Sequence, residues 1–401
     1  MTLRRALVAT ISCSLMFVLG CGGSSSGPKN IIVGSGSNVA TLTVNPGPNG
    51  SYANGAFTSV QVCVPGTSTC QTISGILVDT GSSGLRILSS ALSISLPQQT
   101  GSGGDPIAEC LPFVSAFTWG SVETADVQIA SETASSVPIQ VIGTSNFEIP
   151  TSCSDNGTPA DDLASLGANG LVGVGLALQD CGEGCTVAGP SNFGLYYSCP
   201  TSTSCAVTTE PLAAQVVNPV SLFPTDNNGV IIELPSANGS EATLTGSLVF
   251  GIGTESNNAL GSAAVYTVND FGNISTTFNG TTYQDNSFLD SGSNGFYFLD
   301  SSSSGIPGCS DDADFYCPSS VDNLSATNIG TNNASASFNF SIANADTLFN
   351  NGANDAVFSQ LSGPFGAGMF DWGLPFFYGR NVFTAIETKS TPGGTGPFWA
   401  Y

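Results

Sequence analysis

The chain has 401 residues, with 6 Lys and Arg against 29 Asp and Glu, no His and a formal net charge of −23. So acidic a chain repels nucleic acids and anionic lipid surfaces, and we expect neither as a partner. The absence of His excludes Ser-His-Asp and Cys-His catalysis and His-ligated metal centres. Carboxylates, hydroxyls and the backbone remain for any chemistry, and we expect no metal and no cofactor.

Residues 1–21 have the pattern of an export signal. Two arginines precede a mostly apolar stretch that is too short for a convincing membrane span. The stretch ends in Val-Leu-Gly-Cys at Cys21, which resembles the lipobox of bacterial lipoproteins, where this Cys is lipidated. An ordinary secretory signal with an incidental Cys is the alternative. Residues 22–38 are rich in Gly and Ser, and we predict a flexible tether.

The expected location is the cell envelope, with the protein held to the membrane through its lipid anchor alone. Gly22, rather than Asp, follows Cys21, so the usual signal for retention in the inner membrane is missing. The outer membrane, facing the periplasm, is therefore the favoured address.

The rest of the chain exceeds the usual size of one hydrophobic core, so we expect two lobes, at 39–215 and 216–401. Short runs rich in Val, Ile, Thr and Phe are separated by Ser, Asn and many of the 49 glycines, and long helical periodicity is scarce. The pattern predicts an all-β protein.

Beyond Cys13 and Cys21, the cysteines form an even set that predicts up to five disulfides in an exported chain. Two pairs flank short turns and are the easiest to propose, Cys63 with Cys70 and Cys309 with Cys317. Pairing among the others stays open: Cys110, Cys153, Cys181, Cys185, Cys199 and Cys205. A zinc cluster is the competing interpretation, but no paired Cys-x-x-Cys motif supports it.

Two segments, one in each half of the chain, have nearly the same sequence. Residues 76–84 read Ile-Leu-Val-Asp-Thr-Gly-Ser-Ser-Gly, and residues 287–295 read Ser-Phe-Leu-Asp-Ser-Gly-Ser-Asn-Gly. Each is an apolar strand that ends at an Asp, Asp79 or Asp290, and the pair predicts a duplicated domain that brings two carboxyls together. Two carboxyls in contact hold one proton between them, so one can act as a base on a water while the other acts as an acid.

At these loops the sequence resembles pepsin-like aspartic peptidases, and more closely a family of bacterial lipoproteins of unassigned function thought to share that fold. Residues 57–73 resemble the hairpin that leads into the first catalytic strand. Residues 170–175 and 371–373 match the glycine turns behind each Asp loop, although Asp371 is not apolar, and 377–379 is an alternative for the second turn. The resemblance implies an all-β, two-lobed pepsin-like acid-protease fold with a central cleft.

The resemblance also implies a role for each loop residue. The two Asp residues would form the catalytic dyad that activates a water. The hydroxyl residue after each Asp would brace the loops, the glycine would let them approach each other, and the next serine would hydrogen-bond the outer carboxylate oxygen. In chain order these residues are Thr80, Gly81 and Ser82 after Asp79, and Ser291, Gly292 and Ser293 after Asp290.

Two positions depart from the family pattern. Residues 117–127 resemble the flap over the cleft, with Trp119 in place of the usual Tyr and a shortened tip; Trp119 as a core or edge-strand aromatic is the alternative. Arg86 stands where a buried aromatic is usual. It would either pair with a local acid or present a cation near the cleft to an anionic substrate group.

These features favour a membrane-tethered aspartic endopeptidase that hydrolyses peptide bonds of a peptide or protein substrate. The alternative is a catalytically inactive protein of the same fold that binds peptides or cell-envelope components. The intact Asp loops favour the first, and the altered flap and Arg86 favour the second. The sequence does not determine the oligomeric state.

Overall fold

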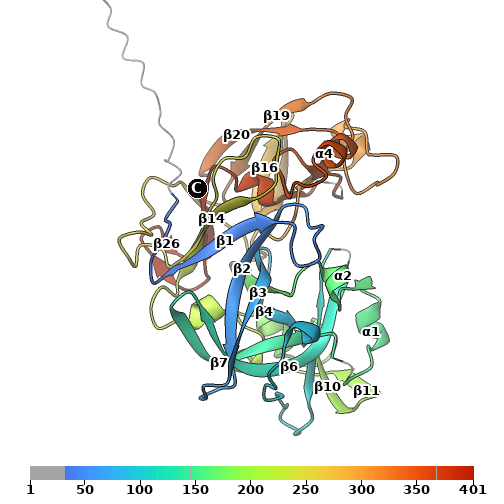
Figure 1. Ribbon diagram of the computed structural model, residues 1–401, viewed down its shortest axis with the longest axis vertical. Helices are drawn as coiled ribbons and strands as arrows, with labels where there is room; N and C mark the ends of the chain where they lie inside the picture. Colours follow the sequence, from blue (N-terminus) through green and yellow to red (C-terminus); the bar gives the residue numbers. More distant parts are fainter. Residues whose placement is uncertain (1–31, 115, 145, 367) are drawn as a thin grey trace, which may run out of the picture.

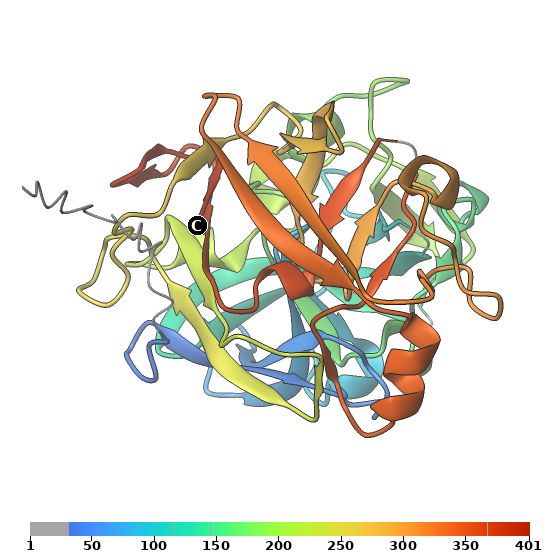
Figure 2. The same ribbon diagram turned by 90° about the horizontal axis from the view of Figure 1, so that it is seen from above.

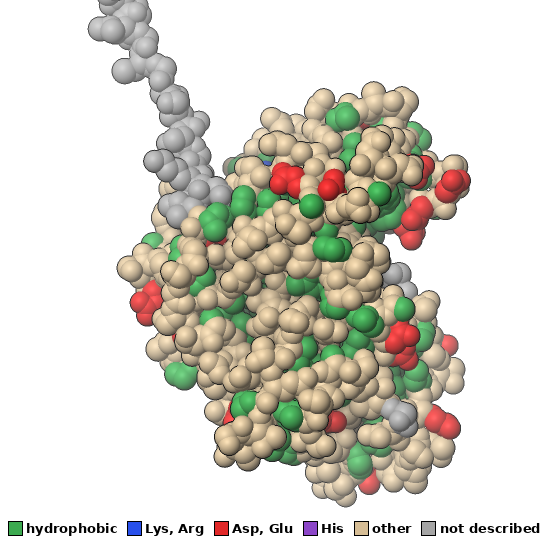
Figure 3. All heavy atoms as spheres, in the orientation of Figure 1, with side chains coloured by type: hydrophobic (Ala, Val, Ile, Leu, Met, Phe, Trp, Pro, Cys, Tyr) green, Lys and Arg blue, Asp and Glu red, His purple; other side chains and the backbone are tan. Residues whose placement is uncertain are grey.

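The computed structural model describes residues 32–401, except 115, 145 and 367. The expected all-β, two-lobed architecture is confirmed: strands dominate, and in the described residues the longest α-helix is α4 (Ala345–Asn351). In Figure 1 the first half of the chain forms the lower lobe and most of the second half forms the upper one. Figure 3 shows that the outline is indented between them. No helix of the described part is both long and apolar enough to cross a bilayer.

The first half folds into one strongly twisted sheet. Its strands lie in the order β11-β10-β5-β6-β7-β4-β9-β3-β2-β1. Their bounds are β1 Val39–Asn45, β2 Gly55–Cys63, β3 Cys70–Asp79, β4 Ser83–Leu88, β5 Ile107–Pro112, β6 Ala116–Ile129, β7 Glu132–Ile142, β9 Gly170–Val174, β10 Tyr196–Thr201 and β11 Ser204–Val207. The short helices α1 (Thr151–Ser154) and α2 (Leu163–Leu166) lie at its periphery (Figure 1).

The second half contributes to two large sheets and also forms two small ones. Five strands continue the first sheet beyond β1: β14 Leu244–Phe250, β12 Gly229–Glu233, β24 Asn381–Ala385, β27 Phe398–Ala400 and β15 Val265–Thr267. Seven strands form a separate sheet: β20 Ser335–Ile342, β19 Asp322–Ile329, β16 Ile274–Phe278, β17 Thr281–Leu289, β23 Phe370–Trp372, β18 Phe296–Phe298 and β22 Ser362–Gly363. The two-stranded sheets pair β13 Ser240–Glu241 with β21 Val357–Phe358, and β25 Ser390–Thr391 with β26 Gly394–Thr395. Helix α3 (Ser301–Ser304) follows β18.

Strand β1 joins the two halves. It pairs antiparallel with β2 of the first half and with β14 of the second, from Val39 opposite Val249 to Val44 opposite Leu244. Figure 2 shows these two strands side by side. The first sheet is therefore continuous from one half to the other.

The same strand arrangement occurs once in each half and places the Asp residues. Strand β3 pairs in parallel with β9, with Asp79 opposite Gly173, and β17 pairs in parallel with β23, with Leu289 opposite Trp372. Strands β4 and β18 then pair antiparallel with β9 and β23. Strand β3 is buried from Ile76 to Asp79, as expected of a strand covered on both faces, whereas in β17 the apolar run before Asp290 is only Phe288 and Leu289. The second turn is thus at 371–373 and not at 377–379.

The predicted tether needs a correction at its end. Residues 1–31, which include Cys21 and most of the tether, lie outside the described residues. Close to the first strand, however, the Val33 N–H donates to Glu233 Oε2 at 2.7 Å, and Asn38 Nδ2 donates to Phe250 O at 2.9 Å. Asn38 is buried. The chain is therefore bound to the second-half strands before residue 38, because buried polar groups there need partners.

Five disulfides are present, as expected. Cys63–Cys70 and Cys309–Cys317 pair as proposed, and the open set resolves into Cys110–Cys153, Cys181–Cys185 and Cys199–Cys205. None of these cysteines offers a free thiolate for zinc.

Candidate active site between the two Asp loops

The two Asp loops are tied together by four reciprocal hydrogen bonds. Thr80 Oγ1 accepts from the Ser291 N–H at 2.9 Å and donates to Leu289 O at 3.0 Å. Ser291 Oγ accepts from the Thr80 N–H at 3.1 Å and donates to Val78 O at 2.8 Å. Both hydroxyls are buried, so each loop satisfies backbone groups of the other.

The glycines after these hydroxyl residues allow the carboxyls to approach. A Cβ on Gly81 would lie 2.7 Å from Asp290 Oδ2, and a Cβ on Gly292 would lie 2.8 Å from Asp79 Oδ1. Contacts this short are not tolerated, so any larger residue would push the opposite carboxyl away. Asp79 and Asp290 are thus held face to face.

Each carboxyl also accepts donors from its own loop. Asp79 accepts from the Gly81 N–H at 2.7 Å and from the Ser82 hydroxyl. Asp290 accepts from the Gly292 N–H at 2.7 Å and from the Ser293 hydroxyl at 3.0 Å. Backbone and hydroxyl donors orient the carboxyls and favour their charged forms.

Desolvation is the main reason that the pKa of Asp290 is raised well above its ordinary value. The negative charges of Asp79 and Asp371 and a hydrogen bond with Asp79 raise this pKa further. A proton is therefore held at Asp290 within this coupled pair of carboxyls.

Tyr52, in the loop between β1 and β2, also belongs to this site. Its pKa is raised by desolvation and then by the charges of Asp79 and Asp290, which places its hydroxyl within electrostatic reach of both carboxyls. Its ring packs edge-on against Phe57, with the centroids 5.4 Å apart. It carries no motif in the sequence, and only the fold brings it here.

Asp371 is a third carboxyl at the site. It lies on β23, is 2 % exposed, and its Oδ2 is within hydrogen-bond distance of Ser293 Oγ, at 2.5 Å. Its other oxygen, Oδ1, is buried without a partner. Desolvation raises the pKa of Asp371 to about 8. A polar residue in an otherwise apolar turn was the one sequence signal for it.

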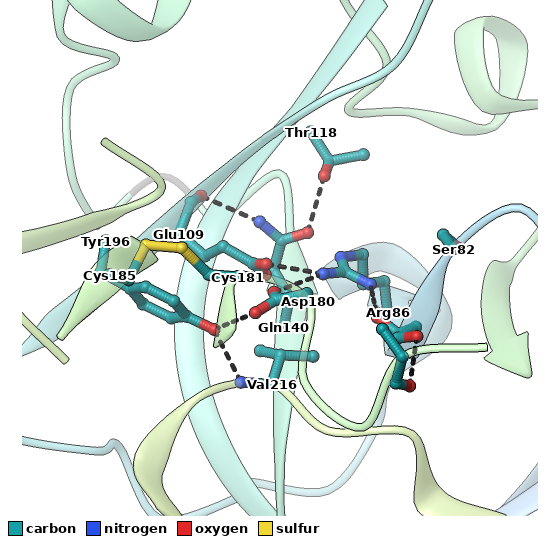
Figure 4. Close-up of polar contacts among 12 residues, drawn as sticks. Ser82, Arg86, Glu109, Thr118, Gln140, Asp180, Cys181, Cys185, Tyr196 and Val216 are labelled. Atoms are coloured by element: carbon teal, nitrogen blue, oxygen red, sulfur yellow. Dashed lines mark hydrogen bonds and ion pairs between the residues drawn. A yellow bond between two sulfur atoms is a disulfide. The ribbon is translucent and has the colours of Figure 1, made fainter. Parts of the chain in front are cut away.

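Arg86 lies behind the first Asp loop, not in the cleft. It is fully buried, and its Nη2 contacts Glu109 Oε1 at 2.6 Å and Asp180 Oδ2 at 2.7 Å (Figure 4). Its Nη1 donates to Ser83 O at 2.8 Å, directly after Ser82. The structure therefore corrects the suggestion that Arg86 presents its charge to a substrate: the cation pairs with local acids, the other alternative.

The surroundings of Arg86 are an extended buried network. Tyr196 donates its hydroxyl hydrogen to Asp180 Oδ1 at 2.7 Å and accepts the Val216 N–H at 2.7 Å (Figure 4). Desolvation opposes the charge of Arg86, but Glu109 and Asp180 outweigh it and raise its pKa. Desolvation and then Glu109 raise the pKa of Asp180 well above its ordinary value. The network fixes the base of the first loop.

Trp119 is a core residue, which is the alternative to its assignment to the flap. It is 1 % exposed, stacks edge-on against Tyr197 at 5.2 Å, and donates its indole N–H to Phe147 O at 3.2 Å. The neighbouring Gly120 lies in mid-strand, where a Cβ would come 1.9 Å from Val141 O. The turn of the β5–β6 hairpin comes earlier, closed by the Phe113 N–H and Ala116 O at 2.7 Å.

The hairpin turn brings Phe113 towards the site. Phe113 packs in a cluster with Leu77, two residues before Asp79, and with Tyr52. The hairpin turn therefore comes a few residues before 117–127, the stretch that resembles the flap. The aromatic of this turn that packs near Leu77 is Phe113.

Comparison with known proteins gives one family and one fold. An aspartic proteinase from Irpex lacteus, solved by crystallography, superposes with a TM-score of 0.51 at 16% identity, over 90% of this chain and 96% of that one. At that identity the likeness establishes the fold alone. No curated protein matches the sequence. Residues 34–401 match the model of DUF3443, described as a protein of unknown function, and the chain belongs to that family.

Proposed function

We propose that this protein is a membrane-tethered aspartic endopeptidase that uses Asp79 and Asp290 to activate a water against a peptide bond. The observation that carries the proposal is the reciprocal brace of the two Asp loops, with a raised pKa on one carboxyl of the pair. A protein that only binds would have no need of one proton held between two opposed carboxyls. The substrate is a peptide or protein, and no nucleic acid or cofactor takes part.

The proposed chemistry uses one charged and one protonated carboxyl in the pair. The Asp79 carboxylate takes a proton from a water, whose oxygen attacks the carbonyl carbon, while Asp290 gives its proton to the carbonyl oxygen. The tetrahedral diol then breaks its C–N bond as the leaving nitrogen takes the proton from Asp79, and a hydroxyl proton returns to Asp290. Protons balance over the cycle, and no metal or covalent intermediate is needed.

Peptide-library hydrolysis between pH 3 and 7 tests the proposal. Asp79→Asn and Asp290→Asn are each expected to lower kcat/KM by at least about 10⁴-fold, with the near-UV circular dichroism unchanged. A statine-type mimic of the diol should bind at least about 10²-fold more tightly than a matched peptide. Asp314→Asn, an exposed carboxyl outside the two Asp loops, is the control and should retain activity.

If the folded, disulfide-bonded wild type hydrolyses no peptide, the second candidate is favoured: an inactive protein that binds peptides or envelope components. In that case the Asn variants are expected to keep their peptide affinity, because Asn is nearly isosteric with Asp. The burial of Trp119 in the core, at the stretch that resembles the flap, is the observation that favours this candidate.

The location of the protein in the cell is a second proposal. We infer a lipid anchor at Cys21 and a place at the outer membrane facing the periplasm. Metabolic labelling with a fatty acid should label the wild type and not Cys21→Ser, and membrane fractionation should release that variant into the soluble fraction. An unlabelled wild type would indicate an ordinary secretory signal instead.

A further inference from the structure

Ser293 stands between two carboxyls with a single hydrogen to donate. Its Oγ lies 3.0 Å from Asp290 Oδ2 and 2.5 Å from Asp371 Oδ2. A hydroxyl donates one hydrogen, so both contacts are hydrogen bonds only if one of the two carboxyls donates to Ser293 in turn. Each arrangement therefore requires at least one proton on Asp290 or Asp371.

The burial of Asp371 indicates where that proton lies. Asp371 is 2 % exposed, and its Oδ1 has no hydrogen-bond partner. An ionised carboxylate with a bare, buried oxygen is far more costly than a neutral acid whose carbonyl oxygen is left unpaired. A neutral Asp371 donates through Oδ2 to Ser293, and Ser293 then donates to Asp290.

We propose that Asp371 is a positioning residue that holds a reserve proton for Asp290 and delivers it through Ser293. The inference rests on the proposed peptidase function. When Asp290 has given its proton to the substrate carbonyl, the Ser293 hydrogen moves to Asp290 Oδ2 and the Asp371 hydrogen moves to Ser293. One proton is transferred, and the charge passes from Asp290 to Asp371. The reverse transfer restores the starting state.

The groups around Asp371 favour this role. Ser293 and Asp290 face it from the loop after β17, Tyr297 lies opposite it on β18, and the charge of Asp79 also acts on it. Burial raises the pKa of Tyr297, and the nearby groups raise it further: Asp371, Tyr52, Asp314 and Asp312. These neighbours are acids or phenols, and both ion pairs of the described residues belong to Arg86. Nothing in this group stabilises a negative charge on Asp371, which agrees with the pKa of about 8.

The pH profile of kcat/KM tests the inference. Removing the reserve proton and the nearby acid should make Asp290 lose its proton at lower pH. We therefore expect Asp371→Asn and Asp371→Leu to move the alkaline limb to lower pH by about one unit or more. Leu is accommodated at the equivalent position of the first half, where Leu171 is buried, so this variant should fold.

Two further variants separate proton transfer from packing. Ser293→Ala should give the same shift as Asp371→Asn, and the double variant should shift no further, because both residues act along one path. Asp314→Asn, beyond Tyr297, should leave the profile in place. An Asp371→Asn profile that coincides with the wild type would overturn the inference, since Asn keeps the shape and the hydrogen bond but holds no transferable proton.

Proton counting gives a readout that does not depend on turnover. Carboxyl carbon resonances of ¹³C-labelled Asp are followed between pH 4 and 9 in the wild type and in Asp371→Asn, which identifies the Asp371 signal by its loss. We expect that signal to remain that of a neutral acid at pH 6. If it titrates near pH 4, the inference fails even where the enzyme is active. If it stays neutral in a protein without activity, the proposed function fails and the proton-holding geometry stands.

Discussion

The two Asp loops are alike at the front and different behind. Strand register makes Leu171 of the first half equivalent to Asp371 of the second. Leu171 lies opposite Leu77, two residues before Asp79, and Asp371 lies opposite Phe288, two residues before Asp290. On the antiparallel neighbour, Arg86 lies opposite Leu171, and Tyr297 lies opposite Asp371. The first loop thus has a buried cation behind it, and the second has a buried acid.

The difference shows how a duplicated frame can surround its two carboxyls with unlike groups. Behind Asp79 the charges of the Arg86 network are compensated within the network and hold the loop in place. Behind Asp290 the uncompensated Asp371 raises the pKa of its neighbour, after desolvation and Asp79. The brace between the loops is reciprocal, so the difference between the two surroundings lies in these residues behind the loops.

Removing the buried cation should have the largest effect on stability. Arg86→Met leaves Glu109 and Asp180 without their partner in the interior, and we expect a loss of about 3–5 kcal/mol in the free energy of unfolding near neutral pH. Urea unfolding with intact disulfides measures it.

The matched change in the second half is Tyr297→Phe. It removes one hydroxyl, which donates to Asn294 Oδ1, and should cost about 1 kcal/mol. Equal losses from Arg86→Met and Tyr297→Phe would contradict the contrast between the two halves.

The brace, by comparison, should respond equally from either side. Thr80→Val and Ser291→Ala each leave a buried backbone N–H without its acceptor, so each is expected to cost about 1–3 kcal/mol. The double variant should cost less than the sum, because the two residues share one network. Urea unfolding measures both losses of stability. If they differ strongly, the two loops do not depend on each other equally, which would contradict a symmetric brace.

Asp371→Leu should alter how stability depends on pH. The pKa of Asp371 is about 8 in the folded state, and an unfolded Asp titrates near about 3.9, so the folded state holds a proton that the unfolded chain has released. Stability falls as pH rises between these values, by up to about 1.4 kcal/mol per pH unit for one group. The variant should lose this part of the slope, which unfolding curves at pH 4, 6 and 8 would reveal.

Part of the slope should survive in Asp371→Leu. Desolvation raises the pKa values of Glu210 and Glu233 to about 7 as well, so these groups lower stability with rising pH in the same way. An unchanged slope in Asp371→Leu would mean that Asp371 titrates alike in the folded and unfolded states.

The smallest effect is expected at Trp119. Trp119→Phe keeps an aromatic ring against Tyr197 and loses the hydrogen bond to Phe147 O, for about 1 kcal/mol of stability. KM for a cleaved peptide should not change, because this side chain lies in the core. Phe113→Ala, in the hairpin turn near Tyr52 and Leu77, should raise KM. A raised KM for Trp119→Phe together with an unchanged KM for Phe113→Ala would instead indicate that Trp119 is the flap residue.

The sequence predicted the fold and the contact between the two Asp loops, because a motif that occurs once in each half indicates a duplicated domain. The apolar strand before each Asp and the glycines after it are required by local geometry, so they are visible in the chain. Arg86, Trp119 and Tyr52 are different. Their surroundings depend on residues far away in the sequence, and no local pattern distinguishes a buried, paired cation or a core indole from one that faces a cleft. Asp371 was visible as an exception in its turn, but its contact with Ser293 appears only once β17 and β23 are paired.

The pairing of β1 has a consequence for the order in which the chain can mature. Its partner β14 lies in the second half, and the Asn38 amide just before β1 bonds Phe250, 212 residues later. If the first half folds before the second half has been made, one of its strand edges stays uncovered. A fragment that ends near residue 215 should aggregate when made alone, and should become soluble when the complementary fragment is produced with it.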